Sequence, residues 1–293
     1  MRILHHSLRF GDSLNLIRLS PDSLHLLHAR GRGIQVDAPA GWVSLWWPLH
    51  GRIGLTATGS EWTLPARHMQ LWRDGALRCR ALGPQAWLAL AGPAALWDGS
   101  ALAHEKDLPL LLPWRGSAGR EVVGLFARLA RGDHAGSNRP AGDPATLFPA
   151  LWSALADRQH ELQARLPRCN GRTLARRQQT LLRLLRVRHA IECNPDVRLD
   201  LECLAKAANY SPCHLIRIFR GVFDQTPSEY AARLREQQAW EMVSGTGLPI
   251  CEITEMLGFE SQSAFCRAFK NTFGQTTSEV RRSMQHDGQA VAA

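Results

Sequence analysis

One residue pattern occurs twice near the end of this 293-residue chain, and the two copies lie about fifty residues apart. The first copy covers residues 210–229 and the second covers residues 259–279. With this offset Arg217 aligns with Arg267, and the flanking serines and phenylalanines align as well. Each copy has the residue types of helices joined by tight turns. The duplication therefore predicts two helix-turn-helix units, an arrangement typical of sequence-specific DNA binding.

Capping residues predict where the helices of the first copy begin. Asp200 precedes one stretch of apolar residues at helical spacing, and Ser211 precedes the next. Pro212 then stands at the first helical position, where its missing N–H removes no hydrogen bond. Residues 226–229 read Thr-Pro-Ser-Glu, which is a capping box. This box opens a helix to about Val243, which we expect to connect the two copies rigidly.

The second helix of a helix-turn-helix enters the major groove, where its first residues meet base edges. The outward residues predicted to read bases are Cys213, Ile216, Arg217, Gln262, Ser263 and Arg267. The residues predicted to contact phosphates, which position a protein without specifying sequence, are Ser211, His214, Arg220, Ser261 and Lys270. Arginine pairs bidentately with guanine and glutamine with adenine, so the second copy has the fuller polar set. The first copy relies on Arg217 and on apolar contact with thymine methyl groups.

The net charge of +9 is consistent with DNA binding but does not locate it. Residues 174–293 carry 15 basic and 13 acidic side chains, so the duplicated part is the least positive part of the chain. The placement of individual arginines, and not the total charge, therefore points to the DNA-binding surface.

Residues 1–100 predict short strands separated by turns at roughly ten-residue spacing. The expected strands cover residues 43–48, 61–64, 69–72, 77–80 and 87–90. Asp74-Gly75 is a hairpin signal. The spacing indicates a small β-barrel or jelly roll. The seven tryptophans of this part either fill its core, which we favour, or line a ligand cavity: Trp42, Trp46, Trp47, Trp62, Trp72, Trp87 and Trp97.

Residues 101–172 change to helical periodicity, with expected helices at residues 121–131 and 147–166. Their apolar stripes fit either dimerisation or packing within the domain, and the sequence does not separate the two. Residues 167–171 read as a linker. A further helix follows from Thr173 to about Cys193, and Asn194-Pro195 ends it.

Several classes of protein are disfavoured. The seven cysteines form no Cys-x-x-Cys pair, so neither a zinc site nor a disulfide framework is indicated. The histidines, including His25, His28, His50 and His68, show no metal-ligand spacing, and no cofactor is expected. No run of about 18 apolar residues predicts a membrane span. The N-terminus does not resemble a signal peptide, which favours the cytoplasm.

Residues 199–282, about a third of the chain, resemble the DNA-binding domain of the AraC/XylS family of transcriptional regulators. The residues that carry the resemblance are Tyr210, Ser211, Leu215, Arg217, Phe219 and Arg220 in the first copy, and Pro249, Ile250, Gly258, Phe259, Ser261, Phe265, Arg267 and Phe269 in the second. The departures are Asp224 where the family has glycine, Thr254 where it has alanine, Thr277 where it has proline and Val280 where it has tyrosine.

The resemblance implies two helix-turn-helix units joined by one long helix, and a cupin-like sensing barrel in residues 1–100. It also implies dimerisation through the sensor. We therefore expect an α+β protein with a barrel at 1–100, flanking helices at 101–172 and an all-α domain at 173–293. The expected partners are double-stranded DNA, a second copy of the chain, a small-molecule effector and RNA polymerase.

The expected function is sequence-specific regulation of transcription, without enzymatic activity. Two alternatives remain at this point. Pro212-Cys213-His214 resembles the methyl-accepting cysteine of DNA-alkyl repair proteins, some of which carry the same DNA-binding domain. The other alternative is a ligand- or protein-binding module with vestigial DNA-binding units.

Overall fold

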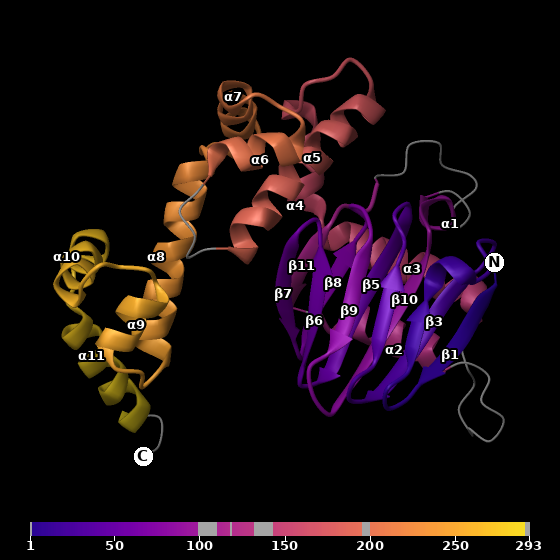
Figure 1. The fold of residues 1–293 in the computed structure, drawn as a ribbon, viewed down its shortest axis with the longest axis horizontal. Coiled ribbons are helices and arrows are strands. Elements are labelled where there is room, and N and C mark those ends of the chain that lie inside the picture. The colour runs from indigo at the N-terminus through magenta and orange to yellow at the C-terminus, as the bar shows by residue number, and fades with distance from the viewer. Residues whose placement is uncertain (1, 99–109, 118, 132–142, 195–199, 291–293) are drawn as a thin grey trace. The chain divides into compact units, whose positions relative to one another are not determined.

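The computed structural model describes residues 2–98, 110–117, 119–131, 143–194 and 200–290 (Figure 1). The chain divides into two compact units, Met1–Leu182 and Arg183–Ala293. The first unit is rich in β-strands and the second is helical, so the predicted α+β class is confirmed. Across the described ranges, no helix is both long enough and apolar enough to span a bilayer.

The first unit contains two β-sheets. The larger sheet has the order β1-β3-β10-β5-β8-β11, with strands β1 (Ile3–Leu8), β3 (Leu24–Gly31), β10 (Gln85–Pro93), β5 (Trp42–His50), β8 (His68–Trp72) and β11 (Trp114–Ser117). The smaller sheet has the order β2-β4-β9-β6-β7, with strands β2 (Ser13–Asn15), β4 (Gln35–Ala38), β9 (Leu77–Ala81), β6 (Arg52–Ala57) and β7 (Ser60–Pro65). The pairs β1–β3 and β2–β4 are parallel, and the other neighbouring strands pair antiparallel.

The central strands of the larger sheet are largely buried on both faces, because the two faces meet different layers. On one face Leu26, Leu45 and Leu90 pack in a single cluster with Phe126 and Phe148 of the covering helices. These helices are α1 (Ala94–Asp98), α2 (Arg120–Arg131) and α3 (Pro144–Arg158), and Figure 1 shows α2 and α3 behind the strands. The apolar stripes of the two predicted helices are therefore used for packing within the unit.

The other face of the larger sheet meets the smaller sheet through aromatic side chains. Trp62 of β7 in the smaller sheet contacts Trp72 of β8 in the larger sheet, with ring centroids 5.4 Å apart. Within the larger sheet, Trp46 of β5 lies 5.5 Å from Trp87 of β10. All four are at most 6% exposed. Trp97 is buried as well, so five of the seven tryptophans are core residues as favoured, whereas Trp42 and Trp47 are half-buried.

The hairpin expected at Asp74-Gly75 does not form. The strands on either side, β8 and β9, belong to different sheets, so the chain crosses between layers here. A hairpin forms instead between β6 and β7, where Thr58 and Gly59 both have positive φ angles, 51° and 80°. This is the backbone geometry of a tight two-residue hairpin.

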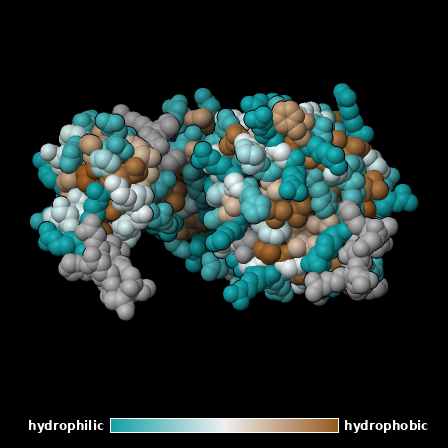
Figure 2. Space-filling model, turned by 90° about the horizontal axis from the view of Figure 1, so that it is seen from below, coloured by the Kyte–Doolittle hydropathy of each residue, from teal (hydrophilic) through white to brown (hydrophobic). Residues whose placement is uncertain are grey.

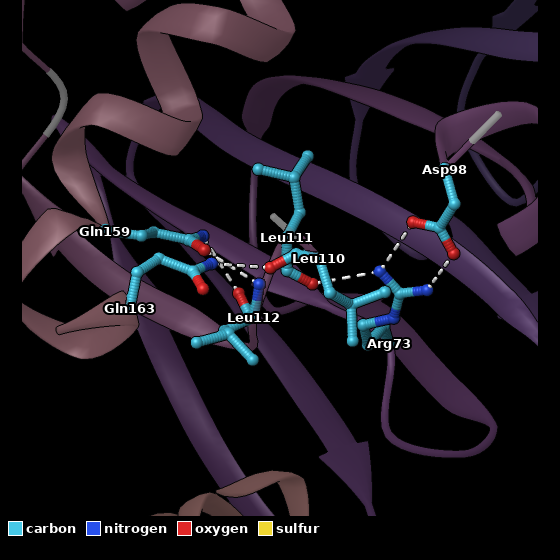
Figure 3. Close-up of polar contacts among 7 residues, drawn as sticks. All are labelled: Arg73, Asp98, Leu110, Leu111, Leu112, Gln159 and Gln163. Atoms are coloured by element: carbon cyan, nitrogen blue, oxygen red, sulfur yellow. Dashed lines mark hydrogen bonds and ion pairs between the residues drawn. The ribbon is translucent and has the colours of Figure 1, made fainter. Parts of the chain in front are cut away.

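The helix expected at 147–166 ends early, at Arg158, and short helices α4 (His160–Gln163) and η2 (Leu166–Arg168) follow. Gln159, only 1% exposed, lies at the break and binds an extended segment through its side chain. Its Oε1 accepts from the Leu112 N–H at 2.7 Å, and its Nε2 donates to the Leu112 carbonyl at 2.9 Å (Figure 3). Two more side chains bind the same extended segment: Gln163 donates to the Leu110 carbonyl, and Arg73 donates to the Leu111 carbonyl. Arg73 is itself paired with Asp98.

The second unit is a chain of helices, and three of them begin directly after the predicted caps Asp200, Ser211 and Thr226. The helices are α5 (Leu174–Cys193, which begins in the first unit), α6 (Leu201–Ala208), α7 (Pro212–Phe223), α8 (Pro227–Gly245), α9 (Ile250–Met256), α10 (Gln262–Phe273) and α11 (Thr277–Ala290). The first unit also contains a short 3-10 helix, η1 (Leu16–Arg18).

Figure 2 shows hydrophilic and smaller hydrophobic areas interspersed on one face of the molecule.

The capping box predicted at residues 226–229 is present, and residues 276–279 form a second one. Thr226 N–H donates to Glu229 Oε2 at 2.7 Å, and Glu229 N–H donates to Thr226 Oγ1 at 3.2 Å. Thr276 and Glu279 repeat both bonds at the same distances. In each box the backbone hydrogen bond from the threonine is the main cause that lowers the pKa of the glutamate.

We predict that replacing both box glutamates, Glu229→Gln and Glu279→Gln, reduces the acid sensitivity of the second unit. A lowered folded-state pKa gives stability that is present above the ordinary glutamate pKa and lost as pH falls through the lowered value. Glutamine keeps the box hydrogen bond but does not titrate. Melting temperatures measured from neutral to acidic pH should therefore fall less steeply for the double variant than for the wild type. Equal slopes would contradict the prediction.

Candidate nucleic-acid interface

Helices α7 and α10 carry the six predicted base-reading residues on their outer surfaces. Five of them are exposed and one, Ile216, is half-buried: Cys213, Arg217, Gln262, Ser263 and Arg267 are the exposed five. The opposite faces are buried through Leu215 and Phe219 in α7 and through Phe265 and Phe269 in α10. The structure thus brings each set of three to one outward helix face, beginning in the first turn.

The predicted phosphate contacts divide into caps and last-turn cations. Ser211 Oγ accepts from the His214 N–H at 3.4 Å, and Ser261 Oγ accepts from the Ala264 N–H at 3.2 Å. Because each hydroxyl acts here as an acceptor, its own hydrogen remains available to a phosphate oxygen. Arg220 and Lys270 are exposed in the last turns of α7 and α10.

His214 differs from the other predicted phosphate contacts because it is half-buried and touches two neighbours. Its ring lies 4.9 Å, centroid to centroid, from the ring of Tyr210, and Arg217 Nη2 lies 3.2 Å from its Nδ1. The guanidinium of Arg183, on α5, stands 5.5 Å from the centroid of the Tyr210 ring. The sequence prediction missed this contact, although the three-residue spacing of His214 and Arg217 on one helix could have signalled it.

Helix α8 lies between α7 and α10, which are called the reading helices below because they carry the predicted base contacts. Tyr230 and Ala231, near its start, are buried on the side of the first copy, and Phe219 contacts Tyr230. Ala239 and Val243, near its end, belong to the core of the second copy. Figure 1 shows α7 and α10 towards opposite ends of α8. The 19 residues of α8 span about 28 Å, which is close to one helical turn of B-DNA.

A polar network anchors α5 to the start of α8. Arg188 donates to Glu192 at 3.2 Å and to the Tyr230 hydroxyl at 3.3 Å, and that hydroxyl also donates to Glu192. The Arg188 guanidinium also lies over the rings of Phe223 and Tyr230. Burial, followed by the charge of Glu192, raises the pKa of Tyr230 to about 12. The network fixes the scaffold on which α7 sits.

The departures from the family pattern are accommodated locally. Asp224 takes the left-handed conformation (φ 63°) at the end of α7, as Gly274 does (φ 71°) at the end of α10. The buried Thr254 hydroxyl donates to the Ile250 carbonyl at 2.7 Å. Val280 is fully buried in the second core. None of the four substitutions removes a helix.

The described residues contain no group of three or more potential ligands that could hold a metal ion. None of the seven cysteines, all within the described ranges, forms a disulfide. Cys79 and Cys169 are buried, and burial raises the pKa of both thiols. Cys213 lies exposed on α7.

Sequence relatives match the part of the chain that carries these helices. A family model described as a helix-turn-helix domain matches residues 204–283. Regulatory protein SoxS of Salmonella typhimurium is 36% identical over 89 residues, which are 30% of this chain and 83% of SoxS. The chain belongs to the AraC/XylS family of transcriptional regulators.

Longer relatives match over a similarly short length of this chain. The Msm operon regulatory protein of Streptococcus mutans is 33% identical over 89 residues, 30% of this chain and 32% of the relative. The chain thus spans about a third of that relative. A transcriptional regulator from Chromobacterium violaceum with an AraC-type DNA-binding domain is similar at 26% identity, with a TM-score of 0.32, over 35% of this chain and 91% of the other. Family membership rests on the sequence match.

Proposed function

We propose that the protein regulates transcription by inserting α7 and α10 into successive major grooves of one DNA site. The observation that carries the proposal is the matched placement of outward residues on two N-capped helices at opposite ends of α8. Arg217, Gln262 and Arg267 supply the polar contacts to base edges. Ser263, Cys213 and Ile216 complete the contact surface.

The phosphate contacts in this proposal come from the capping serines, His214, Arg220 and Lys270. These contacts set the register of the protein on the duplex without reading sequence. Because α7 and α10 lie towards opposite ends of the same helix, α8, we propose that both contact one DNA site and that bending of the DNA helps both to bind.

For the rest of the chain we propose a sensing role for residues 1–100, with 101–172 flanking the sensor and 173–293 binding DNA. A small-molecule effector, self-association as a homodimer and contact with RNA polymerase are parts of this proposal. The cytoplasm is the expected location, since the target is DNA. The apolar faces of α2 and α3 already pack on the sheet, so a dimer would use another surface.

We predict that Arg267→Ala lowers discrimination at one base pair of the binding site by about 1–3 kcal/mol. Arg267 is exposed and has no hydrogen-bond or ion-pair partner among the described residues, so all its donors are available to DNA. Binding of the full chain to selected DNA and to single-base variants, at one moderate salt concentration, measures the effect.

Arg172→Ala is the matched control, because Arg172 is exposed in the first unit and outside the proposed interface. It should leave base preferences unchanged. If the wild type binds selected and random DNA equally, the proposed function is wrong. The repair alternative requires an activated thiolate, yet Cys213 has no hydrogen-bond partner among the described residues. A methyl adduct on Cys213 after incubation with alkylated DNA would favour that alternative.

A further inference from the structure

Four side chains form a continuous row of contacts from α5 to the outer surface of α7. Arg183 lies 5.5 Å from the centroid of the Tyr210 ring, and the Tyr210 ring lies 4.9 Å from the His214 ring. His214 Nδ1 lies 3.2 Å from Arg217 Nη2. The row ends at the arginine that is proposed to read a base in the first copy.

The last contact fixes the hydrogen positions of the His214 ring. Arginine carries only donors, so a hydrogen bond here needs Nδ1 of His214 as the acceptor, which is the tautomer with its hydrogen on Nε2. No described residue accepts this Nε2 hydrogen. The ring can therefore donate to a DNA phosphate through Nε2 while it holds Arg217 through Nδ1.

We propose that His214 is a positioning residue that presets Arg217 for base reading, an inference that rests on the proposed function. One of the five N–H donors of Arg217 bonds to His214, and four remain for the base. Fixing the long side chain before binding reduces the rotamer entropy that is lost when the guanidinium docks. The Tyr210 ring, which the Arg183 guanidinium contacts, packs against the His214 ring and limits its movement.

The second copy lacks this device. His214 aligns with Ala264, which has no acceptor, and Arg267 has no hydrogen-bond partner in the described part of the chain. Arg217 in the first copy is thus held by a neighbouring side chain, whereas Arg267 in the second copy is not. Base discrimination by Arg217 and by Arg267 can therefore be compared within one protein.

The experiment selects binding sites from a random DNA library with the full-length wild type and then measures single-base preferences of variants. Arg217→Ala identifies the base pair that the first copy reads. We expect His214→Ala to lower discrimination at that same base pair by about three- to tenfold, the effect of one hydrogen bond, and to leave the base read by Arg267 unchanged. The separate variant His214→Asn should keep most of the wild-type discrimination at that base pair, because the asparagine Oδ1 can accept the Arg217 hydrogen bond in place of the histidine Nδ1.

Two further variants complete the test. Ala264→His should increase discrimination at the base read by Arg267. The melting temperature of every variant should equal that of the wild type. If His214→Ala binds with wild-type preference at the Arg217 base, or loses preference equally at all positions, the inference is overturned. If His214→Asn behaves as His214→Ala does, the inference is also overturned. A wild type that selects no sequence would instead refute the proposed function, and this inference with it.

Discussion

Phe269→Ala is expected to lower the free energy of unfolding of the second unit by about 3–5 kcal/mol, the cost of truncating a buried phenylalanine. Phe269 is 2% exposed, and its ring lies parallel to that of Trp240 with centroids 6.1 Å apart. It also contacts Phe265 at 5.8 Å and Phe273 at 4.6 Å. The change would leave a cavity where α8 and α10 meet, at a residue that itself faces away from the proposed DNA surface.

Chemical denaturation, followed by tryptophan fluorescence and by DNA binding, measures this loss. Because domains are stabilised by about 5–15 kcal/mol in total, binding should weaken together with stability. Phe10→Ala is the control: Phe10 is 66% exposed, and its loss should change stability by less than about 1 kcal/mol. An unchanged unfolding midpoint for Phe269→Ala would show that the second core does not depend on this ring.

Arg188→Ala is expected to destabilise the second unit by about 2–3 kcal/mol. Removing one member of a buried ion pair leaves the other without compensation, at a cost of about 3–5 kcal/mol, and partial solvent access reduces this cost. The side chains of Arg188 and Glu192 are 28% and 29% exposed, which is the reason for the lower figure. The variant also loses the stacking of the guanidinium on the Phe223 and Tyr230 rings.

The double variant Arg188→Ala, Glu192→Ala distinguishes the network from simple loss of packing. Because it removes both charges, it should be more stable than the sum of the two single changes implies. Additive losses would mean that the ion pair contributes little. Arg172→Ala serves again as a control, since an exposed arginine outside such a network should change stability by less than about 0.5 kcal/mol.

Local sequence signals predicted the second unit well. Helices α7 and α10 begin directly after Ser211 and Ser261, and the box at Thr226 opens α8, because caps act within four residues of chain. The outward placement of Arg217 and Arg267 follows from helical periodicity alone. Their contacts with DNA stay predictions.

The parts that the sequence did not predict depend on contacts between distant residues. Tyr230 meets Glu192 across 38 positions, and Gln159 meets Leu112 across 47. The parallel pairing of β1 with β3 is not predicted by nearby residues either, since the residue pattern of a strand does not specify which strand pairs with it. Asp74-Gly75 misled for the same reason: the dipeptide predicts a turn, but the sheets decide whether the flanking strands pair.

The two capping boxes have the same bond lengths, whereas the reading residues of the two copies share only their arginine. The two copies therefore share the caps that hold their helices, while the surfaces proposed to read DNA differ between them. The side chains that hold the helices are different from those that face outward. If Gln262 and Ser263 read bases as proposed, a mutation at either residue should alter the preferred DNA sequence with little loss of stability, and the base read by Arg217 should stay the same.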